Sequence, residues 1–263
     1  MPNKTKIKVA VHGAAGRVGR EVIAAVSKAT DLQLTCAIDQ LDKGQISLEV
    51  PYYNNVEEAL SEHSTDVIVD FSLAAACLGM LPHVIHHKVS PVIGTTGFSD
   101  KDLRYIADIC NDNKIPGFIA PNFTIGAVLL SKLAAMAAPY FEYVDLIEEH
   151  HENKIDSPSG TAIQIANAIH DAHSDPFSQN HPTREPYPGA RGASIHGINI
   201  HSSRMPGRLA HHQVTFGGPG QSLIIRHDTN DRECYMPGVL MAVRKVLSLH
   251  DFTVGLDQLL DND

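Results

Sequence analysis

The sequence predicts an α/β protein with two domains: a doubly wound sheet of parallel strands, and a second α+β domain whose sheet is mixed or antiparallel. Three observations support this prediction. Short β-branched runs alternate strictly with helical patterns in the first half of the 263 residues, and the first strand runs directly into a glycine-rich loop. In the second half, three strand-like segments follow one another with no helix between them.

Strands joined by right-handed crossover helices are parallel, so the alternating half of the chain predicts one doubly wound sheet. In chain order its expected elements are strand 7–11, helix 18–28, strand 32–38, helix 56–63, strand 66–70, helix 74–86, strand 91–94, helix 100–111 and strand 117–120. Helix 74–86 contains Pro82, where we expect a disturbance because proline removes a helical hydrogen bond.

The second half begins with an apolar helix and ends with a helix that suits either domain. Its expected elements are helix 125–138, strand 143–149, helix 161–172, a Pro- and Gly-rich stretch at 176–192, strands 194–201, 212–216 and 222–227, and helix 239–249. We therefore expect a dinucleotide-binding domain at 1–123 and 233–263, and a substrate-binding and oligomerisation domain at 124–232.

Composition narrows the class of partner. Hydrophobic residues make up 43% of the chain and charged residues 19%, with a formal net charge of -9. This charge argues against a nucleic-acid or anionic-membrane partner and favours a small-molecule ligand held by local positive groups. No run of about 18 apolar residues predicts a membrane span, and the first residues lead into a strand rather than a signal core, so we expect a cytoplasmic protein. The four cysteines are far apart, which favours buried free thiols.

The glycine loop has the pattern of a dinucleotide cradle. In a Gly-x-x-Gly-x-x-Gly loop, Gly13 permits the tight turn, Gly16 lets backbone N–H groups approach a pyrophosphate, and Gly19 lets helix and strand pack. A preceding strand, a following helix and a second strand that ends in Asp39 are the context that this motif requires. The first domain is therefore expected to be Rossmann-type and to bind NAD(H) or NADP(H).

Asp39 bears on the choice between the two cofactors. A carboxylate at this position accepts hydrogen bonds from the adenine ribose of NADH and repels the 2′-phosphate of NADPH, and the next residue is Gln40 rather than Arg or Lys. We expect NADH to be used at least as well as NADPH, with Arg17, Lys43 or a bound cation as the groups that could still accommodate a phosphate.

Two more loops follow predicted strands at the edge where open α/β sheets bind ligands. One is Gly94-Thr95-Thr96-Gly97 and the other is Ala120-Pro121-Asn122-Phe123. Small and hydroxyl-bearing residues in such loops let a nicotinamide ring lie against the backbone. Each loop taken alone also fits an ordinary connection.

The most specific stretch contains two adjacent histidines, a lysine and a helix start. His150 and His151 end a strand, Lys154 lies in the following loop, and Ser159-Gly160-Thr161 opens a helix, with Ser159 or Ser157 as the N-cap. Imidazoles, an ammonium group and helix-start N–H groups together suit a small polycarboxylate substrate, and histidine also transfers protons near neutral pH.

The other candidates have simpler interpretations. A His-Glu-x-x-His zinc motif fails because position 155 is Ile, and we expect no metal site. His83, His86 and His87 follow helical spacing with no carboxylate or Cys beside them in sequence, so a solvated face is expected. Arg244 is expected to be a surface residue, and Arg208, His211 and His212 to be second-domain surface or subunit contacts.

These motifs, taken in order, resemble one enzyme family along nearly the whole chain. The resemblance is carried by the Gly13 to Gly19 loop, Gly94-Thr95-Thr96-Gly97, Ala120-Pro121-Asn122-Phe123, the run from Glu149-His150-His151 through Lys154 to Asp156-Ser157-Pro158-Ser159-Gly160-Thr161-Ala162, Phe216-Gly217-Gly218 and Met236-Pro237-Gly238. The family is 4-hydroxy-tetrahydrodipicolinate reductase, formerly dihydrodipicolinate reductase. It implies NAD(P)H-dependent reduction of a cyclic dicarboxylate imine in the diaminopimelate route to lysine, by a homotetramer assembled largely through the second domain.

The resemblance also implies residue roles. His150 would be a proton donor or acceptor and Lys154 a second proton donor, while His151, Gly160 and Thr161 would hold the substrate carboxylates. The implied cofactor-binding residues are Gly13, Ala14, Ala15, Gly16, Arg17, Val18, Asp39, Gly94, Thr95, Thr96, Ala120, Pro121, Asn122 and Phe123. Two alternatives remain open from the residues alone: a different Rossmann dehydrogenase, and a non-catalytic NAD(H) sensor, which would not need Lys154 beside paired histidines.

Overall fold

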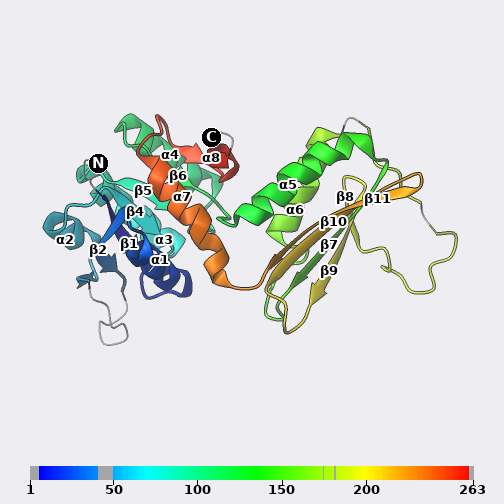
Figure 1. Ribbon diagram of the computed structural model, residues 1–263, viewed down its shortest axis with the longest axis horizontal. Helices are drawn as coiled ribbons and strands as arrows, with labels where there is room; N and C mark the ends of the chain where they lie inside the picture. The colour runs from blue at the N-terminus through cyan, green and yellow to red at the C-terminus, as the bar shows by residue number, and fades with distance from the viewer. Residues whose placement is uncertain (1–5, 41–49, 174, 181, 261–263) are drawn as a thin grey trace. The chain divides into compact units, whose positions relative to one another are not determined.

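The structure is a computed structural model that describes residues 6–40, 50–173, 175–180 and 182–260 (Figure 1). By its internal contacts the chain forms two units, Met1–Ile125 with Arg232–Asp263, and Gly126–Asp231. Each unit has its own sheet and its own hydrophobic core.

The first unit is built on a parallel sheet, as the alternating pattern predicts. Its strands are β1 (Ile7–His12), β2 (Leu32–Ile38), β3 (Tyr52–Tyr53), β4 (Val67–Asp70), β5 (Ser90–Ile93), β6 (Phe118–Ile119) and β12 (Thr253–Val254). Their order is β12-β6-β5-β4-β1-β2-β3, and every pairing is parallel. The stretch from β3 to β6 has the strand order of a Rossmann fold, so the chain reverses direction across the sheet between β1 and β4.

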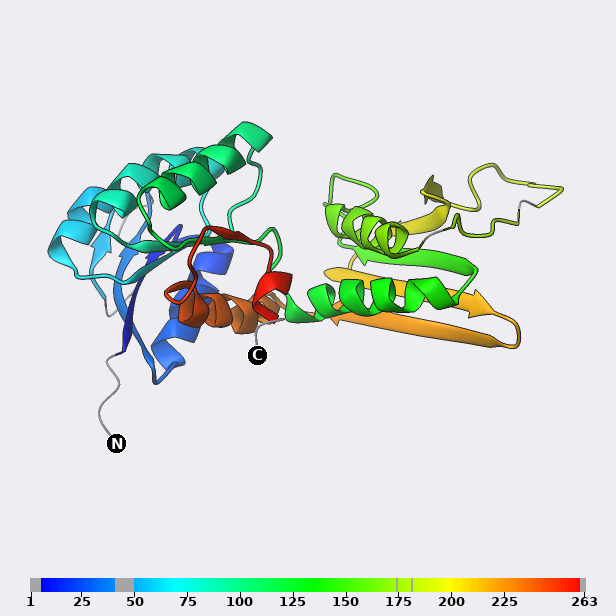
Figure 2. The same cartoon turned by 90° about the horizontal axis from the view of Figure 1, so that it is seen from above.

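Helices cover both faces of this sheet (Figure 2). They are α1 (Arg17–Lys28), α2 (Val56–Glu62), α3 (Ala74–His86), α4 (Asp100–Asp112), the 3-10 turn η3 (Arg232–Tyr235), α7 (Met236–Val246) and α8 (Asp257–Leu260). Helix α4 starts with a capping box, in which the Ser99 side chain accepts from the Asp102 N–H and the Asp102 carboxylate accepts from the Ser99 N–H. Helix α3 is continuous through Pro82, so the expected disturbance does not end the helix.

The second unit combines two helices with a mixed sheet. Its elements are α5 (Ile125–Ala137), the 3-10 turn η2 (Ala138–Tyr140), β7 (Tyr143–His150), α6 (Gly160–Ala172), β8 (Ala193–Ile195), β9 (Ile198–Arg204), β10 (Ala210–Gly218) and β11 (Gln221–Thr229). The strand order is β11-β10-β7-β9-β8, with β7 and β9 parallel and the other pairs antiparallel. Residues of α5, α6 and η2 share one core with the buried sides of β7, β9 and β10.

Three short elements were missed or merged in the sequence prediction. The expected strand 194–201 is a hairpin of β8 and β9, because His196 and Gly197 both have positive φ, 53° and 82°, and form a two-residue turn. Strands β3 and β12 are two residues long each, too short for a periodic pattern to reveal. The predicted final helix also starts earlier, at Met236.

Alternation along β7 decides which side chains enter the second core. Val144, Leu146, Glu148 and His150 are buried, whereas Tyr143 and the other residues between them face the opposite side of the sheet. The strand therefore places a carboxylate and an imidazole on the same face as its two aliphatic residues, which sets up the site described below.

A pair of glycine substitutions tests the packing of the first crossover. A Cβ on Gly19 would lie 2.1 Å from the carbonyl oxygen of Gly13, whereas a Cβ on Gly79, inside α3, meets nothing within 4 Å. We expect Gly19→Ala to lower the unfolding midpoint, because backbone must move to admit the methyl group. Gly79→Ala should raise stability by up to about 1 kcal/mol, the gain in helix propensity. Urea unfolding followed by circular dichroism measures both, and equal effects of the two variants would contradict the close packing at Gly19.

Candidate active site

The glycine loop has the conformation that its pattern predicts. The Gly13 N–H donates to the Ile38 carbonyl oxygen at 2.9 Å, and Gly13 has a φ of 77°, with a Cβ there only 2.5 Å from the Phe71 carbonyl oxygen. Gly16 is the N-cap of α1, which has no side-chain cap and no acidic residue in its first turn. The start of α1 is thus favourable for an anion, because the helix dipole is not offset by a carboxylate of its own first turn.

Asp39 lies beside this loop at the end of β2. Its Oδ2 accepts a hydrogen bond from the Ala15 N–H at 2.9 Å. This hydrogen bond fixes the Asp39 carboxylate against the glycine loop. The side-chain amide of Gln40 donates to the Asn54 carbonyl oxygen at 3.0 Å. Arg17 is exposed at the first position of α1. Lys43 lies outside the described residues.

A buried carboxylate ties together the strand ends around this loop. Asp70, fully buried at the end of β4, accepts from Thr95 Oγ1 at 2.6 Å and Ser72 Oγ at 2.6 Å, and its Oδ1 lies 2.7 Å from His12 Nδ1. Burial alone would raise the pKa of Asp70, but the hydrogen bond from His12 and those from Ser72 and Thr95 outweigh it and lower that pKa. The ends of β1, β4 and β5 are therefore held in one network.

Phe71 extends this arrangement to the other two predicted loops. Its ring would lie 2.2 Å from a Cβ on Gly94, and it packs against the ring of Phe123, with centroids 5.6 Å apart. The loops after β1, β4, β5 and β6 thus meet at one edge of the sheet. The Thr95 hydroxyl donates to Asp70, and the Phe123 ring is buried. The side chains of these two residues therefore contribute mainly to the packing of this sheet edge.

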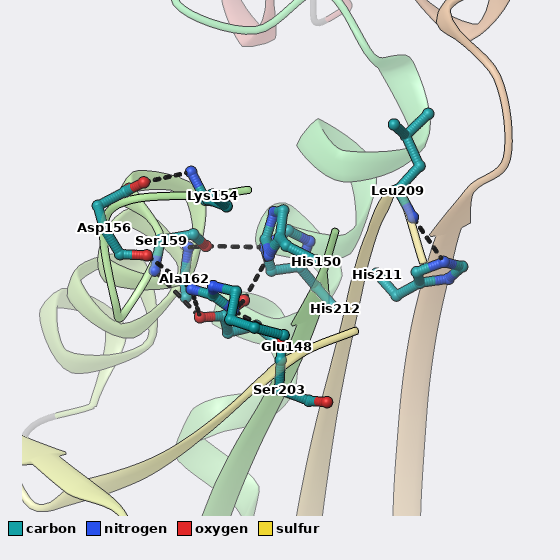
Figure 3. A network of polar contacts seen from close by, with 11 residues as sticks. Glu148, His150, Lys154, Asp156, Ser159, Ala162, Ser203, Leu209, His211 and His212 are labelled. Carbon is teal, nitrogen blue, oxygen red and sulfur yellow. Dashed lines mark hydrogen bonds and ion pairs between the residues drawn. The ribbon is translucent and has the colours of Figure 1, made fainter. Parts of the chain in front are cut away.

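The second group of predicted residues surrounds the end of β7 (Figure 3). His150, the last residue of the strand, is buried, and its Nδ1 forms a short hydrogen bond with Oε2 of Glu148. Glu148 has no exposed side-chain surface. Since Nδ1 faces this carboxylate, Nε2 is the ring nitrogen of His150 that remains for other partners.

Glu148 connects His150 to three other parts of the unit. Its Oε2 also accepts from Arg204 Nη1 at 2.9 Å, and its Oε1 accepts from Arg204 Nη2 at 2.8 Å and from the Ser159 N–H at 3.2 Å. Burial would raise the pKa of Glu148, but hydrogen bonds from His150, Arg204 and Ser202 hold it well below its usual value. Arg204 Nη2 further donates to the Asp156 carbonyl oxygen at 2.7 Å. One carboxylate and its arginine thus fix the imidazole, the start of α6 and the loop between them.

Lys154 is paired with a carboxylate in the loop that leads into α6. Lys154 Nζ donates to Asp156 Oδ1 at 2.6 Å, and this bond, the largest influence, lowers the pKa of Asp156. Ser159 is the N-cap of α6 and accepts from the Ala162 N–H at 3.2 Å. The ammonium group of Lys154 therefore lies against the carboxylate of Asp156, in the loop that leads into α6. Thr161 is the second residue of α6, and His151, directly after His150, is partly exposed.

His212 belongs to this site, and its predicted surface position is wrong. Only 4% of the residue is exposed, its ring lies 5.3 Å from that of His150, and its Nε2 is 3.2 Å from Ser159 Oγ. Burial, followed by the nearby imidazole of His150, lowers the pKa of His212 to about 4, so the ring is neutral at neutral pH. His211 is also buried and is paired with Asp228, whereas Arg208 is half-exposed and pairs with Glu149.

Residues outside these sites also test the sequence predictions. The sequence gives no carboxylate beside the histidines of α3, but in the folded protein Glu57 of α2 contacts His83 and His87. Arg244 is a surface residue as expected and pairs with Asp31 at 2.8 Å. Cys36, Cys77 and Cys110 are buried free thiols and Cys234 is partly buried. Among the described residues, no helix is both long and apolar enough to span a bilayer.

Sequence reasoning did not assign Glu148, Arg204, Asp70 or Phe71 to a site. Glu148 could have been found, because it occupies a core-facing position of β7 between Leu146 and His150, where a charged residue needs a partner. No sequence pattern indicates Arg204, because its contact with Glu148 depends on the parallel pairing of β9 with β7. This pairing joins segments that are distant in sequence.

Comparison with known proteins assigns both units to one family. The model for the dihydrodipicolinate reductase N-terminus matches residues 7–123, and the model for the C-terminus of the same family matches residues 126–260. The chain belongs to the dihydrodipicolinate reductase family. It is 43% identical to the 4-hydroxy-tetrahydrodipicolinate reductase of Nostoc sp., covering 99% of this chain and all of that one, and 41% identical to that of Dehalococcoides mccartyi, covering 97% and 99%.

Solved structures agree with the family. A dipicolinate-bound dihydrodipicolinate reductase from Paenisporosarcina sp. TG-14 matches with a TM-score of 0.87 and 38% identity over 97% of this chain and 99% of that chain. The scyllo-inositol dehydrogenase of Lactobacillus casei with NAD(H) and scyllo-inositol, at 11% identity and a TM-score of 0.62 over 97% and 93% of the two chains, shares the fold alone. The prediction of a Rossmann-type domain joined to a mixed-sheet domain is confirmed.

The geometry of Glu148 predicts a pH-dependent loss of stability on substitution. Glu148→Gln removes the charge that Arg204 and His150 face in the interior, and should destabilise the second unit by about 3 kcal/mol at neutral pH. Because the folded-state pKa lies below the unfolded value of about 4.3, this stabilisation is complete above that value and is lost as the pH falls through the folded-state pKa. Urea unfolding of wild type and variant across pH measures the difference.

The matched control is Asp171→Asn on α6, away from the face of the sheet opposite α5 and α6. Asp171 is exposed. We expect it to change stability by less than about 1 kcal/mol. A gap between wild type and Glu148→Gln that stays constant from neutral to strongly acidic pH would contradict the charge-based explanation.

Proposed function

We propose that the protein uses NADH or NADPH to reduce 4-hydroxy-tetrahydrodipicolinate to tetrahydrodipicolinate, in the diaminopimelate route to lysine and in the cytoplasm. The observation that carries this proposal is the pairing of Lys154 with the carboxylate of Asp156, in the loop between the buried His150 and the start of α6. A dicarboxylate substrate offers the same chemical group to Lys154. Family membership and the dipicolinate-bound relative support this choice of substrate class.

Substrate carboxylates would be held by His151, Gly160 and Thr161. The start of α6 contributes backbone N–H groups and the positive end of the helix dipole, and a Cβ on Gly160 would meet nothing within 4 Å, so the approach to this point is open. Lys154 adds a full positive charge. These groups attract a dianion to a protein whose net charge is -9.

His150 and Lys154 are the proposed proton-transfer groups. Glu148 holds Nδ1 of His150, so Nε2 would exchange a proton with the substrate, and the carboxylate stabilises the imidazolium form. Lys154 is positioned by Asp156 and would deliver the second proton. His212 is neutral, so it adds no charge that would repel an imidazolium at His150.

The glycine loop fits a dinucleotide. The N–H groups at Gly16 and the start of α1 would receive the pyrophosphate, Asp39 the adenine ribose, and the loops from Gly94 to Thr96 and from Ala120 to Phe123 the nicotinamide end. When bound, the reduced nicotinamide would supply hydride to the electron-poor ring of the substrate, and the 4-hydroxyl group of the substrate would accept a proton and leave as water. The residues of the first unit would bind and orient the cofactor, and residues of the second unit would supply the protons.

A homotetramer assembled through the second unit is part of the proposal. The side of its sheet away from α5 and α6 carries apolar residues that are exposed in one chain, among them Tyr143, Ile147 and Ile224. Covering such residues with another copy removes apolar surface from water. Sedimentation analysis of the purified protein measures the assembly.

Substitution of the two proton-transfer residues tests the proposed chemistry. Lys154→Ala should lower kcat by a factor of about 100 or more, and His150→Ala should lower kcat with little change in the KM for the cofactor. The assay follows cofactor oxidation with substrate generated enzymatically. His170→Ala, in the same unit and exposed near the end of α6, is the control and should retain activity. Near-normal kcat in both variants would overturn the assignment.

Cofactor preference is a separate prediction. We expect kcat/KM with NADH to equal or exceed that with NADPH, because Asp39 repels a 2′-phosphate and Gln40 offers no positive charge in its place. Asp39→Asn keeps an acceptor for the Ala15 N–H but removes the charge. It should raise the NADPH-to-NADH ratio of kcat/KM by about tenfold, or about 1.4 kcal/mol. A strong NADPH preference of the wild type would contradict the role given to Asp39.

A further inference from the structure

A cluster of histidines and one glutamate lies in the first unit, apart from the residues of the proposed reaction. Glu57 is in the first turn of α2, His86 is the last residue of α3, and His87 is its C-cap. One ligand-type atom from each of these three residues lies within 4.8 Å of the others. His83, one turn earlier on α3, contacts the same glutamate.

We propose that Glu57, His86 and His87 bind a divalent transition-metal ion of the zinc class, with a water molecule as the fourth ligand. Two imidazoles and one carboxylate are a ligand set that zinc accepts, and a fourth position filled by water is common in zinc sites with three protein ligands. The two nitrogen ligands favour zinc, nickel, cobalt or copper over magnesium or calcium, which prefer oxygen ligands.

The distance between His87 and Glu57 agrees with a metal ion bound by both residues. His87 Nε2 and Glu57 Oε1 are 3.1 Å apart. Two ligands at about 2.0–2.1 Å from a tetrahedral ion are separated by about 3.3 Å, so the ion would replace this hydrogen bond with little movement. The His86 and His87 rings are 5.0 Å apart and almost perpendicular, at 87°, so they are not stacked on each other. His86 is exposed, which leaves its side chain free to turn toward the ion.

The second oxygen of the glutamate is held by a separate histidine. His83 Nδ1 lies 2.8 Å from Glu57 Oε2, while Oε1 faces His87. Metal-ligating carboxylates are usually fixed by such an outer hydrogen bond, which orients the ligating oxygen. Glu57 therefore directs Oε1 toward the proposed ion and has Oε2 held by His83, and the Ser61 hydroxyl donates to Oε1 at 3.3 Å.

An ion pair alone explains the cluster less well. A single carboxylate offsets one positive charge, and three histidines gather around it within one turn of α3 and its cap. A neutral imidazole nitrogen is a metal ligand. The bound ion would link α2 to the end of α3 and so stabilise the first unit by mass action.

Titration of the full-length, tag-free protein with zinc chloride tests the proposal. The chain has 16 histidines, so stoichiometry and the effect of single variants decide the location. Isothermal titration calorimetry after chelator treatment should give one site per chain with a Kd of about 10 µM or lower, and zinc should raise the thermal unfolding midpoint. His87→Ala and Glu57→Gln should each weaken this binding by about 100-fold, and His83→Ala by about tenfold, the usual effect of losing an outer partner.

The control is His250→Ala, which removes an exposed histidine elsewhere in the same unit and should leave the zinc affinity unchanged. Unfolding midpoints without metal establish that each variant is folded. Zinc binding of unchanged affinity in both His87→Ala and Glu57→Gln would overturn the proposal, as would a wild-type Kd above about 1 mM. Reductase activity is not the readout, so this outcome does not depend on the proposed function.

Discussion

The hydrogen-bonded carboxylate of Glu148 is the interaction on which the proposed active site depends. A charge at a core-facing position of β7 is costly to bury, and the cost is offset because both of its oxygens accept from charged or backbone donors. Those donors come from the end of β7, the start of α6 and the end of β9. The same bonds that satisfy the charge therefore fix the relative positions of the imidazole of His150 and the N-cap residue Ser159.

The first unit uses the same physical device at its own sheet edge. Asp70 is fully buried at the end of β4, and its partners on β1 and after β5 hold the ends of neighbouring strands at fixed positions. In each unit a buried carboxylate, Asp70 or Glu148, fixes the loops at the strand ends. The residues proposed to contact a ligand lie next to this carboxylate in the same loops. This division explains why several predicted site residues, such as Thr95 and Phe123, are engaged in packing, while Gly160 and Lys154 remain accessible to a ligand.

Local pattern was sufficient to predict most of the fold, because each helix and each strand of four or more residues in the first unit, except the one-turn helix α8, carries its own periodicity. The merged strand 194–201 shows the limit: its two halves have the same alternation, and only the backbone of His196 and Gly197 separates them. The proposed site was predicted where its residues are contiguous, from His150 to Thr161. Arg204, His212 and Glu57 were missed or misassigned because sheet register or helix packing brings them to residues far away in sequence.

The most direct test of this account is the protonation state of the His150 ring, read by long-range proton–nitrogen NMR correlation of the imidazole. We predict a proton on Nδ1 of His150 with a strongly downfield, hydrogen-bonded chemical shift. In Glu148→Gln this signature should be lost, while the neutral His212 keeps its own signals. A neutral His150 ring protonated on Nε2 with a bare Nδ1, or the same spectrum in the variant, would contradict the claim that Glu148 organises the site.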